Sequence, residues 1–182
     1  MPESEERGRI LVGIAREAIA DPSRTHATRQ WEHEWLREQG ATFVTLRDAV
    51  GELRGCIGTV DAHRPLGDDV AHNAYGAAYR DPRFPPVPSA ERAALGVEVS
   101  VLTAREPIAA ASEAEALDRL GRGRDGVVFE YGEFRATFLP QVWENLPDPL
   151  EFLSELRRKA RLPMRFWHPD VRLWRYGVEK YK

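Results

Sequence analysis

Apolar residues recur three and four positions apart in four stretches of the chain, a spacing that places them on one face of a helix. The first stretch opens with acidic residues and stops at Asp21-Pro22, because proline cannot continue a helix. The last stretch begins with Asp148-Pro149-x-Glu151, which has the spacing of a helix start. These signals predict helices over residues 4–20, 27–38, 65–80 and 148–161.

Alternation of apolar and polar residues, which is typical of half-buried strands, occupies much of the remaining chain. Turn residues at 48–51 and at Gly132 join two pairs of strands into hairpins. The alternation slips near Leu173 and Trp174, which predicts a bulge in the last strand. Hairpins mixed with helices, without regular βαβ units, predict an α+β fold with a mainly antiparallel sheet flanked by helices. The predicted strands cover residues 43–46, 52–60, 97–101, 127–131, 133–138 and 171–181.

The length of 182 residues fits one domain, or one domain with a small additional subdomain. Cys56 is the single cysteine, so no disulfide can form within the chain, which suits a reducing compartment. Residues 1–9 are acidic and lack the apolar core of a signal peptide. No stretch approaches the ~18 apolar residues of a membrane span. We therefore expect a cytoplasmic protein without a membrane segment.

The net charge of −3 hides an asymmetry between the two ends of the chain. Residues 157–182 carry a net charge of +7, and the preceding residues carry −10. Aromatic residues are interleaved with these C-terminal cations, a mixture that could bind single-stranded nucleic acid. The acidic remainder of the chain opposes nonspecific phosphate binding. We therefore favour cations that complement a helix terminus and a solvated strand face.

The segment 53–58, with the sequence LRGCIG, carries the clearest chemical signal in the chain. In a strand, residues two apart share a face, so Arg54 and Cys56 project together while Leu53 and Ile57 face a core. A nearby cation favours the thiolate, which is the nucleophilic form of cysteine. The alternative is that Cys56 is a buried residue that acts as a small apolar filler.

Five further residues complete the site that we expect around the thiol. Gly55 and Gly58 lack side chains, so a ligand or a second chain segment can approach the strand closely. Asp81 and Arg83 belong to an Asp-Pro-Arg-Phe sequence, in which Arg83 either binds an anion or locks a proline-rich loop against the sheet. Lys159, near the end of the last predicted helix, is an outer candidate cation. Together with the strand arginine, these cations predict a pocket for a carboxylate or phosphate beside a thiolate.

Metal and phosphate-loop chemistry have little support in the sequence. The five histidines show no HExxH spacing, and a single cysteine excludes a thiolate cluster, so no metal site and no cofactor are expected. The glycine-rich residues 121–126 lack the Lys-Ser/Thr of a phosphate loop and precede a strand, which favours a turn.

Several segments together resemble the AMMECR domain family, also called AmmeMemoRadiSam system protein A. The combination of Arg-Gly-Cys-Ile-Gly with Asp-Pro-Arg-Phe at this distance is highly specific to that family. One departure is Arg157, which lies in a run where the family more often has a cysteine, so a two-cysteine redox mechanism is not expected here. The matching blocks follow the family's order along residues 8–180: Ala41–Leu46, Leu53–Gly58, Asp81–Pro86, Val99–Thr103, Asp125-Gly126, Leu139–Val142, Phe152-Leu153 and Arg158–Ala160.

The resemblance implies a larger antiparallel-sheet subdomain built from both chain ends, a smaller inserted subdomain, and a cleft between them lined by the Cys56 segment. It also implies shared work with a Memo-like protein and a radical SAM protein, since bacterial and archaeal members tend to be encoded beside these two. It supplies no reaction, because the family has no firmly established activity.

We therefore expect an enzyme or enzyme component that acts on a small anionic substrate. In this interpretation Cys56 is the nucleophile or covalent carrier, and Arg54 and Arg83 bind the anion and stabilise the thiolate. Asp81 orients Arg83, and Lys159 is the outer cation. The alternatives are a noncatalytic scaffold for the two partners and a nucleic-acid-binding protein.

Overall fold

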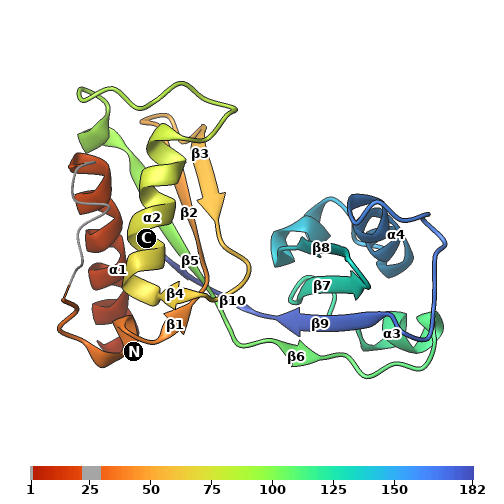
Figure 1. Ribbon diagram of the computed structural model, residues 1–182. Helices are drawn as coiled ribbons and strands as arrows, with labels where there is room; N and C mark the ends of the chain where they lie inside the picture. Colours follow the sequence, from red (N-terminus) through yellow and green to blue (C-terminus); the bar gives the residue numbers. More distant parts are fainter. Residues whose placement is uncertain (1, 22–29) are drawn as a thin grey trace. The chain divides into compact units, whose positions relative to one another are not determined.

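The computed structural model describes residues 2–21 and 30–182, and the chain divides into two compact units (Figure 1). Unit 1 comprises Met1–Leu102 and Glu179–Lys182, and unit 2 comprises Thr103–Val178. Each unit combines helices with a sheet whose paired strands run antiparallel, so the predicted α+β class is confirmed. Among the helices of the described residues, none is both long and apolar enough to cross a bilayer.

Unit 1 is a four-stranded sheet with two helices on one face. Helices α1 (Pro2–Ala20) and α2 (Leu66–Tyr79) pack side by side against the sheet (Figure 1). The sheet has the order β10-β5-β2-β3, formed by Val178–Tyr181, Gly96–Leu102, Thr42–Arg47 and Leu53–Gly58. Short elements complete the unit: β1 (Gln39–Gly40) paired with β4 (Arg64–Pro65), and the 3-10 helices η2 (Glu34–Leu36) and η3 (Arg92–Ala94).

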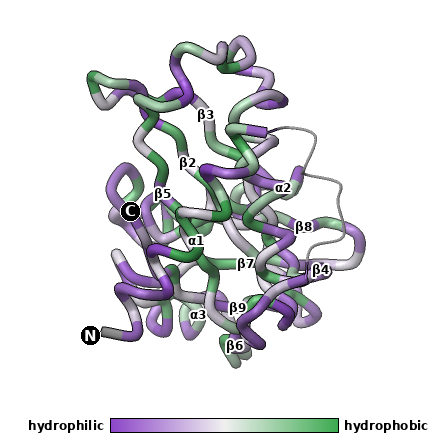
Figure 2. The backbone as a smooth tube through the Cα atoms, turned by 90° about the vertical axis from the view of Figure 1, so that its left-hand side faces the viewer, coloured by the Kyte–Doolittle hydropathy of each residue, from purple (hydrophilic) through white to green (hydrophobic). Residues whose placement is uncertain are grey.

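The core of unit 1 lies between the sheet and its two helices. Val44 and Val99, opposite each other on β2 and β5, are fully buried in it. Hydrophobic residues run along β5, as the green stretches of the tube show (Figure 2). Burial of each large aliphatic side chain stabilises the fold by about 1.5–3 kcal/mol. Because neighbouring residues of a strand point to opposite faces, Thr45 and its partner Cys56 lie on the face away from the helices.

Unit 2 has its own sheet and its own core. The rings of Trp143 and Phe152 stack with their centroids 3.8 Å apart. Arg157 is also fully buried in this unit, and its Nη1 donates to Glu113 at 2.7 Å. The side chains of Ser112 and Asp148 cap the two helices by accepting a backbone N–H three residues later. The elements are β6 (Glu106–Pro107), α3 (Glu113–Arg119), β7 (Gly126–Tyr131), β8 (Phe134–Phe138), η4 (Pro140–Glu144), α4 (Pro149–Lys159) and β9 (Arg172–Tyr176), and the sheet order is β6-β9-β7-β8.

Three of the four predicted helices are confirmed, and the prediction over residues 27–38 is wrong where it can be compared. Residues 27–29 lie outside the described residues, and residues 30–38 contain only the short η2. The reason is that Arg37 folds back and donates to the carbonyl oxygens of Trp31 and Glu32, which an α-helix would have used for its own ladder. Trp31 instead packs its indole against Gly67 of α2.

Both predicted hairpins are confirmed, but the last predicted strand is divided. Residues Arg172–Tyr176 pair with β7 in unbroken register, so the predicted bulge near Leu173 and Trp174 is wrong. The interruption falls at Gly177, which exchanges two hydrogen bonds with Thr103. The residues before it belong to the sheet of unit 2, and those after it belong to the sheet of unit 1.

Candidate functional site

Cys56 lies on an edge strand of unit 1, with its side chain on the face of the sheet that carries no helix. Strand β3 is the last strand in the sheet order, so one row of its backbone groups has no neighbouring strand. The thiol is partly exposed, and Sγ lies 3.4 Å from the Oγ1 atom of Thr45, the residue opposite it on β2. A hydroxyl at this distance can donate a hydrogen bond to a thiolate.

Asp81 and Arg83 cover the free backbone edge of β3 at Cys56. The Oδ2 atom of Asp81 accepts the N–H of Cys56 at 2.9 Å, and Nη2 of Arg83 donates to the carbonyl oxygen of Cys56 at 3.2 Å. Arg83 also donates from Nε and Nη2 to the two oxygens of Asp81, at 3.0 and 2.7 Å. We call these two residues the edge clamp. It fixes the backbone that carries the thiol and protects the edge from pairing with another strand.

Both members of the edge clamp are held in their charged forms. Hydrogen bonds from the Arg83 side chain hold the pKa of Asp81 far below its usual range, against the opposing effect of burial. The backbone N–H groups of Cys56 and Arg83 lower that pKa further. The same pairing with Asp81 raises the pKa of Arg83. Asp81 is only 4% exposed, whereas the Arg83 side chain is 54% exposed, so the pair has a buried end and a solvated end.

Arg54 is also tied to the loop that follows Arg83. Its Nε lies 3.3 Å from Oε2 of Glu91, and its Nη1 donates to the carbonyl oxygen of Pro85 at 2.8 Å. The side chain is 14% exposed. Arg54 therefore holds the proline-rich loop, and its partners among the described residues are atoms of that loop.

The expected orientation of the strand is correct at one end and wrong at the other. Ile57 packs against the core of unit 1, as predicted, but Leu53 is 37% exposed. The register between β2 and β3 shifts between Leu46 and Arg47, opposite the start of β3, and this irregularity turns Leu53 away from the core.

The two glycines of the strand accommodate atoms of the protein itself. A Cβ on Gly55 would lie 2.1 Å from the carbonyl oxygen of Ala77, so helix α2 approaches the strand at this point. A Cβ on Gly58 would lie 2.2 Å from the ring of Phe43 on β2. Of the two expectations for these glycines, close approach of a second chain segment is the one that these contacts support.

Lys159 belongs to unit 2, at the C-terminal end of α4. Its Nζ donates to the carbonyl oxygen of Thr137 at 2.9 Å and lies 5.1 Å from the centroid of the Phe138 ring. Burial lowers the pKa of this amine. A role for Lys159 in the Cys56 site, and the cleft expected between two subdomains, stay predictions.

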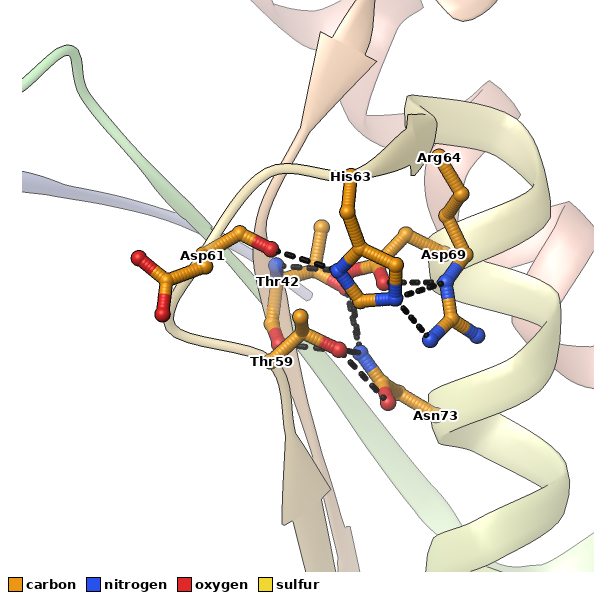
Figure 3. Close-up of polar contacts among 7 residues, drawn as sticks. All are labelled: Thr42, Thr59, Asp61, His63, Arg64, Asp69 and Asn73. Carbon is orange, nitrogen blue, oxygen red and sulfur yellow. Dashed lines mark hydrogen bonds and ion pairs between the residues drawn. The ribbon is translucent and has the colours of Figure 1, made fainter.

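Sequence reasoning missed a buried polar network at the start of α2 (Figure 3). Asp69 is fully buried, and its Oδ2 accepts hydrogen bonds from the backbone N–H and the hydroxyl of Thr42, both at 2.8 Å, and from Asn73 at 3.0 Å. Asn73 also donates to the carbonyl oxygen of Thr42 and to the hydroxyl of Thr59. The network joins the helix to β2 and to the end of β3.

Two residues that precede α2 in the chain, His63 and Arg64, extend this network to the surface. Nε of Arg64 lies 3.3 Å from Oδ1 of Asp69, and the Nε2 atom of His63 accepts from both Nε and Nη2 of Arg64, at 3.2 and 2.6 Å. His63 Nδ1 faces the carbonyl oxygen of Asp61 at 2.7 Å, which assigns the proton to Nδ1. No group of three His, Cys, Asp or Glu in the described ranges is arranged to hold a metal ion.

The sequence does contain a signal for this network. Asp69 and Asn73 are four residues apart, which places them one turn apart on the same face of α2. They adjoin Val70 and Ala74, the residues that predict the apolar face of that helix. Polar side chains at the margin of an apolar face need buried partners, and the periodicity alone does not name those partners.

Comparison with known proteins agrees with the fold and the sequence blocks. The family model AMMECR1 matches residues 12–181. The chain is 39% identical to a protein of Methanothermobacter thermautotrophicus, over 98% of this chain and 95% of that one. It is 38% identical to a protein of Thermofilum pendens, over 97% of this chain and 89% of that one. The crystal structure of the uncharacterized protein PH0010 from Pyrococcus horikoshii superposes with a TM-score of 0.78 at 35% identity, covering 97% of this chain and 91% of that one. The chain therefore belongs to the AMMECR1 family.

Proposed function

We propose that this protein is an enzyme or enzyme component that acts on a small anionic substrate through the thiol of Cys56. One observation carries the proposal: a partly exposed thiol, 3.4 Å from the hydroxyl of Thr45, lies on a strand whose free edge is fixed by the edge clamp. A nucleophile that is held in place avoids part of the entropic cost of reaching its substrate.

The proposal gives each nearby residue a distinct role. Cys56 is the nucleophile or covalent carrier, and the Thr45 hydroxyl stabilises its thiolate by donating a hydrogen bond. The half-exposed guanidinium of Arg83 attracts the anionic group of the substrate, and Asp81 positions it. Arg54 holds the proline-rich loop through Glu91 and Pro85. The partners that the family resemblance suggests are a Memo-like protein and a radical SAM protein.

The test is alkylation of the native protein by iodoacetamide over a range of pH, followed by intact mass. Because Cys56 is the single cysteine, every adduct reports this site. We expect one adduct on the folded protein at neutral pH. Thr45→Val should slow the reaction at neutral pH, whereas Thr59→Val, a hydroxyl removed elsewhere in the unit, should leave it unchanged. Alkylation that appears only after unfolding would reject a thiol mechanism.

A noncatalytic binding module is the second candidate, and one observation favours it. Arg54 and Arg83 each direct Nε to a carboxylate of the protein, so a substrate anion competes with Glu91 and Asp81 for them. A scaffold needs no free thiol. If Cys56→Ala retains stoichiometric binding of the Memo-like and radical SAM proteins together with full activity of the assembly, the scaffold is supported and the enzyme proposal fails.

A further inference from the structure

We propose that Arg64, the first residue of the short strand β4, is the centre of a second site, one that binds the two oxygens of a phosphate or carboxylate group. The ligand replaces His63 at the Nε/Nη2 edge of the guanidinium. This site is separate from that of Cys56, because the buried network that holds Arg64 lies on the α2 side of the sheet and the thiol faces the other side.

The hydrogen bonds of Arg64 differ from those of Arg54 and Arg83. Arg83 gives its Nε/Nη2 edge to both oxygens of Asp81, and Arg54 gives Nε to Glu91. The same edge of Arg64 faces one nitrogen lone pair of His63, which must serve two N–H donors. An oxyanion offers one oxygen to each donor, in the bidentate geometry for which guanidinium is suited.

Asp69 holds Arg64 in place by charge and accepts no hydrogen bond from it. The two groups are an ion pair at 3.3 Å, yet Oδ1 of Asp69 has no hydrogen-bond partner within the described part of the chain. The other oxygen, Oδ2, is satisfied by Thr42 and Asn73. The buried carboxylate therefore supplies charge that fixes the guanidinium, while no N–H group of Arg64 makes a hydrogen bond to it.

The surroundings leave the outer edge of Arg64 open to an anion. The Arg64 side chain is 25% exposed, and His63, which covers its edge, is an exposed loop residue. The carboxylate of Asp61 points away from Arg64 (Figure 3), and the carboxylate of Asp68 accepts the indole N–H of Trp31. Arg64 lies two residues before the start of α2, whose N-terminal dipole favours a negative charge at this end. An exposed imidazole is a partner that a ligand can displace at small cost.

The experiment is a titration of the full chain with inorganic phosphate, and separately with acetate, at about pH 8, where phosphate is a dianion. Binding is followed by calorimetry and by the ¹⁵N–¹H signal of Arg64 Nε in the wild-type protein. We expect saturable binding and a shift of that signal. Binding of phosphate alone assigns the site to phosphate groups, and binding of acetate alone assigns it to carboxylates. Failure of both anions to shift the Arg64 signal overturns the proposal.

Three variants separate this site from general anion attraction. Arg64→Gln should weaken binding about ten- to a hundredfold, because a charge-assisted bidentate contact is lost. Arg119→Gln removes the same charge from an exposed helix of unit 2 and should leave binding unchanged. His63→Ala should bind at least as tightly as the wild type, because the competing acceptor is gone. Loss of binding in His63→Ala, or equal binding by Arg64→Gln in a folded state, contradicts the proposal.

Discussion

Unit 1 contains two pairs of a buried aspartate and a nearby arginine, and the two pairs are used in opposite ways. In the edge clamp, both oxygens of Asp81 accept from Arg83, so the arginine is closed by its own aspartate. In the network at α2, Oδ2 of Asp69 accepts from Thr42 and Asn73, and Oδ1 forms an ion pair with Arg64 without a hydrogen bond. The comparison teaches that a buried carboxylate can accept the hydrogen bonds of an arginine, or can hold the arginine by charge and leave its N–H groups to another acceptor. The other hydrogen-bond partners of the carboxylate decide which of the two occurs.

The largest effect is expected from Asp69→Ala, which removes the acceptor for three buried donors and the ion partner of Arg64. We expect the free energy of unfolding to fall by about 3–5 kcal/mol, as for breaking a buried charged network. Chemical denaturation measures it. Asp68→Ala is the matched control, since Asp68 is adjacent in sequence but lies partly exposed and accepts one indole N–H. Asp68→Ala should lower the free energy of unfolding by about 0.5–1.5 kcal/mol. Equal losses in the two variants would contradict the special role of the buried Asp69.

Asp81→Ala should cost about 2–4 kcal/mol, less than Asp69→Ala because its partner Arg83 can turn to water. The same variant should speed alkylation of Cys56, since the free edge of β3 loses its cover. Asp81→Asn keeps one acceptor for the N–H of Cys56. Its alkylation rate should lie between those of Asp81→Ala and the wild type. An alkylation rate that stays unchanged in Asp81→Ala would show that the edge clamp does not control access to the thiol.

The edge clamp also makes a prediction about pH. The pKa of Asp81 is lower in the folded protein than in the unfolded chain, so the stabilisation is fully present above the unfolded value of about 3.9. It is lost as pH falls through the folded value, because protonation then breaks the pair. Unfolding measured from pH 6 to about pH 2 should show a stability loss that is smaller in Asp81→Asn than in the wild type. If the stability of both proteins falls equally with pH, other carboxylates cause the loss of stability in acid.

The comparison is tested most directly by removing each arginine. Arg83→Gln takes two charge-assisted hydrogen bonds from buried Asp81 and should cost about 1–3 kcal/mol. Arg64→Gln takes no hydrogen bond from Asp69 and should cost about 1 kcal/mol less than Arg83→Gln. Double-mutant cycles should accordingly give a larger coupling energy for Asp81 with Arg83 than for Asp69 with Arg64. The reverse order would contradict the distinction between an arginine that is hydrogen-bonded to its aspartate and one that is held by charge.

The smallest effect is expected from His63→Ala. His63 is exposed, and within the described part of the chain its ring is hydrogen-bonded to Arg64 and to a loop carbonyl. Its removal should change the free energy of unfolding by no more than about 0.5 kcal/mol. A loss as large as that of Arg64→Gln, measured by the same denaturation, would make His63 part of the support rather than a displaceable cover.

Local sequence patterns predicted an element correctly where its formation depends on residues within that element. The helix that became α2 and the hairpin that carries Cys56 were predicted because apolar spacing and turn residues act within a few positions. The helix expected over 27–38 failed because Arg37 bonds to nearby carbonyl groups and Trp31 packs on Gly67, a residue of a distant element. The final strand divides at Gly177 because its two halves pair with different sheets.

For the candidate site, the sequence by itself determined the chemistry that is present: one thiol, the neighbouring Arg54, and an Asp-Pro-Arg-Phe sequence 25 residues after the thiol. It left open whether Arg83 binds an anion or locks a loop. Only the tertiary structure decided that Asp81 and Arg83 bond to the backbone of Cys56, and that Asp69 forms an ion pair with Arg64. The physical reason is that hydrogen bonds act over about 3 Å in space, whatever the separation along the chain, so residue types can be read locally but their partners cannot.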